Sequence, residues 1–271
     1  MSLYTVVGAT GFVGARLTEA LRRDGHEVYA PARGDPDLLE RELGRVFYCA
    51  GLTADYLQRP FDTVKAHVGL IARVLETARF ERLVYLSSTR LYDSLAGEGG
   101  DEGAPLALRP AEPRHLYDLS KGLGENLCLT QASGRAAVAR LSCVFDHAPG
   151  APGFLAEWLQ RARREREIAL ASSTGYVRDY IHLDDTVAAL RAIVDSDLAV
   201  PVNVASGENL SNADLAAVFE RLGWRIRFER ETERQAAPLC DVARLAALGV
   251  RPRSALDVIE TVLKETPVAA G

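Results

Sequence analysis

The stretch that decides the fold is LYTVVGATGFVGARLTEALRRDGHEVYAPAR, residues 3–33. Residues 3–7 are an apolar run that predicts a short strand, and residues 8–14 follow as a glycine-rich turn. In residues 15–23 apolar side chains recur at helical spacing, and residues 27–30 begin a second strand. Strand, turn, helix and strand within about 30 residues form a βαβ unit.

The same alternation continues along the chain. Further strands are expected at 45–50, 83–87 and 137–142, and helices at 60–78 and 116–131 separate them. Such alternation is typical of a parallel sheet covered on both faces. We therefore predict an α/β protein, a Rossmann-type doubly wound parallel sheet with a small C-terminal α/β substrate domain. The short link before residue 45 predicts that one edge of the sheet is trimmed.

The pattern changes after residue 143, where the turn-rich DHAPGAPG follows. We expect residues 1–143, with about 176–205, to form the nucleotide-binding domain. Residues 144–175 and 206–265 are then the small substrate-binding part. Within this part EWLQRARREREI, residues 157–168, is expected to be a charged helix.

Composition narrows the classes of partner. The chain has 271 residues, 48% of them hydrophobic, and a net charge of −5. No nucleic acid and no membrane partner is expected from this charge, and no apolar run reaches the roughly 20 residues of a bilayer span. Four cysteines without CxxC spacing predict buried thiols and no metal, and a cytoplasmic location is expected. His182 is expected to be a hydrogen-bonded structural residue, and Asp184 and Asp185 to cap a helix.

The glycine turn predicts a dinucleotide cofactor. Gly8, Gly11 and Gly14 have GxxGxxG spacing between strand and helix, where the backbone can approach a pyrophosphate at the start of the helix. The residues after the second strand select the cofactor, because a carboxylate there binds the ribose of NAD and a cation favours NADP. Arg33 slightly favours NADP, whereas the two acids of GDPD, Asp35 and Asp37, keep NAD open.

A reactive pair is predicted in HLYDLSKGLGEN, residues 115–126. Tyr117 and Lys121 are four residues apart, on one stripe of a helix. A phenol with a pKa of about 10 is a poor acid–base catalyst near neutral pH, and a desolvated ammonium beside it favours the phenolate. Two glycines in the same helix, Gly122 and Gly124, predict a close approach to the sheet or to a dimer mate. In LVYLSSTRLYD a strand ends at Ser87, Ser88 and Thr89, where α/β sheets bind ligands.

Together these motifs resemble the extended short-chain dehydrogenase/reductase family of the NAD-dependent epimerase/dehydratase type. The matching pieces, in family order, are GATGFVG, CAG, LVYLSSTRLYD, YDLSKGLGEN, ARLSCVF, VRDYIHLDD and NVASGENLS. They cover most of the chain.

The resemblance implies roles for individual residues. Tyr117 resembles the catalytic acid–base, Lys121 its partner and Ser88 the third catalytic residue. Ser88, Thr89, Arg90 and Arg178 are implied to contact substrate, Arg178 at the diphosphate of a nucleotide-sugar. A homodimer formed through a four-helix bundle is also implied. The cofactor contacts implied by position are Gly8, Thr10, Gly11, Phe12, Val13, Gly14, Arg33, Cys49, Ala50, Gly51, His67, Tyr117 and Lys121.

Departures from the family pattern narrow the range of reactions that the resemblance implies. Dehydratases of the family carry Asp-Glu directly after the catalytic Thr; here Thr89 and Arg90 occupy those two positions, which argues against 4,6-dehydration. Cys143 replaces an Asn that is common in nucleotide-sugar epimerases. We predict an NAD(P)-dependent oxidoreductase or epimerase that transfers hydride at a carbinol or ketone carbon, of a nucleotide-sugar. The alternatives are an NADPH-dependent ketoreductase acting on a small non-sugar ketone, or a non-catalytic NADP-sensing regulator.

Overall fold

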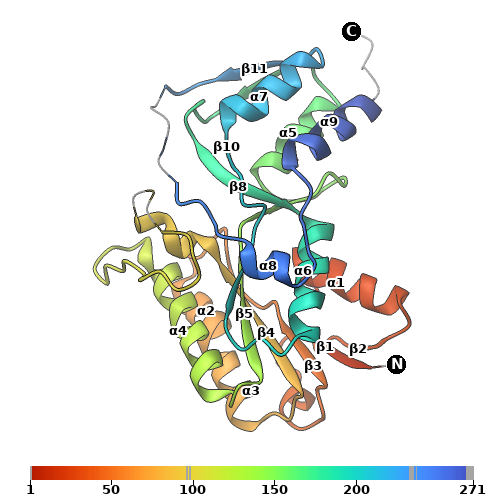
Figure 1. Ribbon diagram of the computed structural model, residues 1–271, viewed down its shortest axis with the longest axis vertical. Coiled ribbons are helices and arrows are strands. Elements are labelled where there is room, and N and C mark those ends of the chain that lie inside the picture. Colours follow the sequence, from red (N-terminus) through yellow and green to blue (C-terminus); the bar gives the residue numbers. More distant parts are fainter. Residues whose placement is uncertain (1, 96, 98, 232–234, 236, 267–271) are drawn as a thin grey trace.

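The structure, a computed structural model, describes residues 2–95, 97, 99–231, 235 and 237–266 (Figure 1). Among them, six strands form a central sheet in the order β2-β1-β3-β4-β5-β9, and all neighbouring strands are parallel. This confirms the predicted α/β fold with a parallel sheet, and β2 is its trimmed edge. The strands are β1 (Leu3–Val7), β2 (Glu27–Tyr29), β3 (Arg45–Tyr48), β4 (Arg82–Ser88), β5 (Ala136–Leu141) and β9 (Pro201–Val204).

Helices cover both faces of this sheet, on opposite sides in Figure 1. Alternate residues of each strand point to opposite faces. Val6 and Phe47 therefore pack with one apolar cluster, under α1 and α6, whereas Val7 and Tyr48 pack with another, under α3 and α4. The helices are α1 (Phe12–Arg23), α2 (Pro60–Val64), η2 (Lys65–Gly69), α3 (Leu70–Thr77), α4 (His115–Gln131), α6 (Leu183–Asp195) and α8 (Ala243–Ala247).

A third apolar cluster, centred on Trp158 and Phe219, lies in the upper part of Figure 1. It agrees with a separate substrate-binding part, although the domain limits stay a prediction. The strands here are β6 (Cys143–Phe145), β7 (Glu167–Leu170), β8 (Val177–His182), β10 (Asn209–Ser211) and β11 (Arg225–Phe228). The helices are α5 (Phe154–Ala162), α7 (Asn212–Arg221) and α9 (Ala255–Glu265). Two short 3-10 turns, η1 (Pro36–Leu39) and η3 (Thr89–Leu95), follow β2 and β4.

Three expected helices differ in detail. Helix α1 begins at Phe12, three residues before the predicted start. The helix expected over 60–78 is interrupted by a π-helical turn at Lys65–Gly69. The charged helix expected over 157–168 is wrong in its second half, because α5 ends at Ala162 and Ile168 lies in β7. Parallel pairing of β7 with β11 overrides the local helical preference there.

Candidate active site

The glycine turn lies tightly between β1, the loop after β3 and the start of α1. Gly8 has a φ of +87°, and a Cβ on it would lie 2.8 Å from the backbone nitrogen of Ala50. A Cβ on Gly14 would lie 2.3 Å from the carbonyl oxygen of Gly8. A side chain at Gly8 would therefore push the turn away from the CAG loop, Cys49–Gly51, and one at Gly14 would push α1 away from the turn itself.

The start of α1 is open to an anion. Gly11 is its N-cap, with no side-chain capping bond and no acidic residue in the first turn. In contrast, α6 begins with a His182 cap and two aspartates, and Ser211 caps α7. The free N–H groups and positive dipole end of α1 thus suit a pyrophosphate.

A hollow of about 320 Å³ adjoins this helix start. Thr10, Gly11 and Phe12 line it from the turn, Arg16 from α1, and the loop 146–152 faces them. The residues present therefore fit a dinucleotide. Val13, in the first turn of α1, is half-buried against the cluster under α1.

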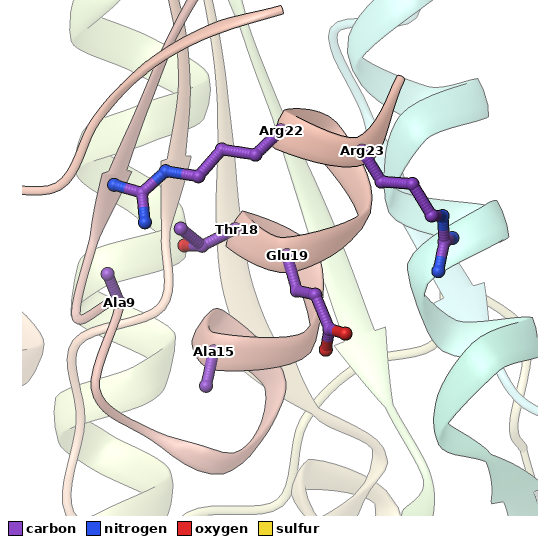
Figure 2. A pocket seen from close by; sticks show the side chains of 6 residues that line it. All are labelled: Ala9, Ala15, Thr18, Glu19, Arg22 and Arg23. Atoms are coloured by element: carbon purple, nitrogen blue, oxygen red, sulfur yellow. The ribbon is translucent and has the colours of Figure 1, made fainter. Parts of the chain in front are cut away.

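A second hollow, of about 650 Å³, runs along α1 (Figure 2). Ala9 of the glycine turn lies at one end, and Arg22 and Arg23 lie at the C-terminal end of the helix. Its lining contains no predicted catalytic residue, so size alone does not mark the chemical site here.

Tyr117 lies in α4, opposite the end of β4. Its side chain is only 4% exposed, and burial raises the pKa of its phenol. The neighbouring side chains of Ser88 and Thr53 and the charge of Arg90 act the other way and lower this pKa, whereas the charge of Asp118 raises it further. The net effect of this setting is a raised pKa, because burial outweighs the neighbours that favour the phenolate.

Lys121 lies one turn further along α4. Its Nζ donates a hydrogen bond to the carbonyl oxygen of Leu86, at 2.8 Å, which ties the helix to β4. Burial lowers the pKa of Lys121 to about 8, from an ordinary 10.5. The structure therefore brings Ser88, Tyr117 and Lys121 together at one strand end, although their catalytic roles stay predictions.

His67, a predicted cofactor contact, is fully buried beside Tyr117. Its Nε2 accepts a hydrogen bond from the Leu52 backbone at 3.3 Å, so we assign its proton to Nδ1, which lies 2.8 Å from Ser120 Oγ. Burial and the charge of Lys121 lower the pKa of His67 to about 3, so the ring is neutral. Both nitrogens have protein partners, which favours a bracing role over the predicted direct contact with the cofactor.

Two of the side chains predicted to contact substrate, Arg90 and Arg178, are linked by a series of ion pairs. Arg90 Nε lies 3.7 Å from Asp118 Oδ1, and Arg178 Nη2 lies 3.7 Å from Asp93 Oδ2. Arg114 bridges the two aspartates at 3.7 and 3.9 Å. The chain Arg90–Asp118–Arg114–Asp93–Arg178 thus joins the Tyr117 helix to β8. Thr89 Oγ1 donates to the Leu141 carbonyl at 3.4 Å, at the end of β5.

Arg33, the basis for the NADP preference, is exposed and lies four residues beyond the end of β2. The pKa of Asp62 in α2 is lowered chiefly by its hydrogen bond with Arg59, and the charge of Arg33 contributes least. Asp35 is the nearer acid to β2: after burial, its carboxylate is the next cause that raises the pKa of Tyr29, and it accepts a hydrogen bond from the Asp37 backbone.

Sequence reasoning missed Thr53, Tyr56 and Asp118. Thr53 lies near enough to Tyr117 to lower the pKa of its phenol, the Tyr56 ring lies edge-on to the Tyr117 ring at 5.4 Å, and buried Asp118 pairs with Arg90. Thr53 and Tyr56 follow the CAG loop within a few residues, and this proximity was the available signal. Asp118 adjoins Tyr117 in sequence but has no motif of its own.

One group of possible metal ligands lies elsewhere. Within the described ranges, Asp146, His147 and His182 place ligand atoms within 4.8 Å of one another. His182 Nδ1 accepts from Asp184 N at 3.2 Å and faces Arg253 Nη2 at 2.9 Å, so its proton lies on Nε2, towards His147. A metal would need that Nε2 lone pair. The arrangement agrees with the structural role expected for His182, and the absence of a metal stays a prediction.

The expectation that all four cysteines are buried is met only in part. Cys128 and Cys240 are buried and Cys49 is half-buried, but Cys143 at the start of β6 is exposed. All four thiols are free. The helices of the described residues include none long and apolar enough to cross a membrane.

Comparison with known proteins decides the family. The family model for the NAD dependent epimerase/dehydratase family matches residues 4–205, well over half of the chain. The chain belongs to this family. The resemblance inferred from the motifs is thereby confirmed.

Individual relatives are distant. The chain is 22% identical over 264 residues to UDP-glucuronic acid decarboxylase 1 of Xenopus tropicalis, an alignment that covers 84% of this chain and 62% of the relative. It is 23% identical to the spore coat polysaccharide biosynthesis protein SpsK of Bacillus subtilis (strain 168), with 98% of each chain covered. The chain thus spans about 62% of the length of the first relative and nearly all of the second.

Solved structures share the fold. MoeE5 in complex with UDP-glucuronic acid and NAD has a TM-score of 0.73, with 22% identity and 96% of each chain covered. UDP-glucuronic acid 4-epimerase from Bacillus cereus, in complex with UDP-glucuronic acid and NAD, has a TM-score of 0.74, with 15% identity and 97% and 99% covered. These similarities confirm the Rossmann-type architecture.

Proposed function

We propose that this protein is an NAD(P)-dependent enzyme that transfers hydride at a carbinol or ketone carbon of a nucleotide-sugar. One observation carries the proposal: Tyr117 lies opposite the end of β4 with Ser88 near enough to lower the pKa of its phenol, and Lys121 is fixed one turn along the same helix. Parallel sheets bind ligands at this edge. A regulator without catalysis would have no need of this arrangement.

The protein's own residues can handle the proton. Tyr117 exchanges a proton with the substrate hydroxyl, and Ser88 orients the same oxygen. Lys121 adds positive charge and a hydrogen-bond donor near the ribose position. The Gly8–Gly14 turn and the start of α1 would hold the cofactor, whose nicotinamide supplies hydride transfer when bound.

Support for a nucleotide-sugar comes from two sources. Arg178 and its ion-pair partners lie on the substrate side, where an arginine can bind a diphosphate bidentately. The relatives and solved structures include proteins named for UDP-glucuronic acid. Arg90 after Thr89 argues against 4,6-dehydration, which leaves epimerisation or net oxidation–reduction. The alternative, reduction of a small non-sugar ketone, would leave Arg178 without a ligand.

For the cofactor we propose NAD ahead of NADP, against the slight preference drawn from Arg33. The solved relatives named above contain NAD. Arg33 is exposed beside Asp62, whereas Asp35 is held near the end of β2. Native mass spectrometry of the purified protein tests this. If the protein retains NAD, the result supports NAD as the cofactor and epimerisation as the reaction. An empty site that binds NADPH in preference to NADH would instead restore the NADP prediction and favour a reductase.

Tyr117→Phe tests the catalytic assignment. The ring keeps its packing but loses the exchangeable proton, so turnover of UDP-sugars should fall by at least about 100-fold. Binding of NAD, followed by nicotinamide fluorescence or calorimetry, should stay within about twofold. Unchanged turnover would contradict the assignment.

We further propose a homodimer and a cytoplasmic location.

A further inference from the structure

Arg90 lies against the catalytic tyrosine. It follows β4 in the turn η3, and its guanidinium carbon is 5.0 Å from the centroid of the Tyr117 ring. The same carbon is 4.7 Å from the centroid of Tyr56. The two rings meet edge-on at 5.4 Å, so a single cation contacts both aromatic rings.

This position is fixed by three contacts. Arg90 Nη2 donates to the Tyr56 hydroxyl at 2.5 Å, and the Arg90 backbone N–H donates to Ser88 Oγ at 3.2 Å. Its Nε lies 3.7 Å from a carboxylate oxygen of Asp118, which is buried and also pairs with Arg114. The guanidinium therefore cannot move away from Tyr117 without giving up a buried ion pair.

Among the described groups around Tyr117, none other than Arg90 places a positive charge over its ring. His67 is neutral, Tyr56 and Tyr85 are phenols, and Asp118 is an anion shared by two arginines. The ammonium of Lys121 is committed to the Leu86 carbonyl and lies over the Tyr85 ring. Several titratable or charged groups face Tyr117 directly or lie next to a group that faces it. They are Tyr56, His67, Tyr85, Arg90, Arg114, Asp118 and Lys121.

We propose that Arg90 is a positioning residue that clamps the Tyr117 ring and stabilises its phenolate form, alongside Lys121. The proposal deepens the proposed function, because it rests on Tyr117 being the acid–base group. The charge of Arg90 lowers the pKa of Tyr117, in agreement with the contact geometry. An acid–base catalyst works best when its pKa is near the working pH, so burial that raises this pKa requires compensation.

Direct titration of Tyr117 tests the proposal without any substrate. The ultraviolet absorbance of tyrosinate is followed against pH, with and without saturating NAD, and the curve of Tyr117→Phe is subtracted to isolate this phenol. In Arg90→Gln the midpoint of Tyr117 should rise by about one pH unit, since the neighbouring cation is lost. Arg90→Lys should recover most of this shift.

Arg114→Gln is the matched control, because Arg114 shares Asp118 with Arg90 but itself contacts Asp118, Asp93 and Ser94. It should shift the midpoint less than Arg90→Gln does, and circular dichroism should show all variants folded. An unchanged midpoint in Arg90→Gln would overturn the proposal. So would an Arg90→Lys variant that behaves like Arg90→Gln, because charge would then not be the cause. A protein inactive on nucleotide-sugars would defeat the proposed function but leave this titration decisive.

Discussion

At the scale of single residues, Lys121 shows a conflict between stability and catalysis. The residue is only 5% exposed, and the described hydrogen bond of its ammonium goes to an uncharged carbonyl, that of Leu86. Burial disfavours the charged form and holds the pKa at about 8. The unfolded chain, with a pKa near 10.5, then binds the proton more tightly. The free energy of unfolding should therefore rise with pH between these two values.

Lys121→Met should expose this conflict. The variant removes a buried charge and keeps much of the side-chain volume, so at about pH 7 its free energy of unfolding should exceed that of the parent by about 1 to 2 kcal/mol. Catalytic turnover should be lost. Urea unfolding at several pH values between about pH 7 and pH 10 provides the measurement, and the parent's gain with pH should vanish in the variant. A variant less stable than the parent at every pH would contradict the interpretation.

The sequence could predict part of this site for a physical reason. Tyr117 and Lys121 lie in one helix, where spacing alone fixes their relative direction, and Ser88 ends a strand whose apolar run is evident. Thr53 and Tyr56 belong to a loop whose path depends on tertiary contacts, such as the bond from the Leu52 backbone to His67. No local pattern encodes such a path. The role of Arg90 likewise depends on packing between two aromatic rings that are distant in sequence.

At the scale of elements, the packing of α4 explains one of the two glycines in this helix. A Cβ on Gly124 would lie 2.3 Å from the Tyr85 hydroxyl and 2.8 Å from the His67 carbonyl oxygen. Gly124 thus lets α4 approach β4 and the π-helical turn η2 closely enough for Lys121 to reach Leu86. Around Gly122, by contrast, no described atom beyond its chain neighbours and the helix's own backbone lies within 4 Å of where a Cβ would stand. The predicted close approach to the sheet therefore concerns Gly124 alone.

The pair Gly124→Ala and Gly122→Ala tests this difference within one helix. Alanine at 124 must displace α4 from β4, which should lower the free energy of unfolding by about 1 to 3 kcal/mol despite the better helix propensity of alanine. It should also weaken turnover, because Tyr117 and Lys121 move with the helix. Alanine at 122 should raise stability by up to about 1 kcal/mol. Denaturant unfolding of both variants gives the comparison, and equal effects would contradict a steric role for Gly124.

At the scale of the whole molecule, α2 and α4 lie beside each other (Figure 1), and both expose large apolar side chains. Phe61 is 80% exposed, and Val64 and Leu123 also expose much of their side chains. A cluster of large exposed apolar side chains is typical of an interface between proteins. The resemblance to the family implies a dimer formed by helices, and this surface is where we expect the second copy to bind.

Phe61→Glu should therefore dissociate the proposed homodimer. A charge placed in the centre of an apolar interface must be desolvated, which should raise the dissociation constant at least about tenfold, or about 1.4 kcal/mol. Light scattering coupled to size-exclusion chromatography over a range of protein concentrations measures the mass. Leu239→Glu is the control, since Leu239 is 58% exposed but lies in the segment between β11 and α8. The parent and Leu239→Glu should both elute as dimers and Phe61→Glu as a monomer. A parent that is monomeric throughout, or a Phe61→Glu variant that stays dimeric, would refute the role of this surface, because apolar exposure on α2 would then serve no contact between copies.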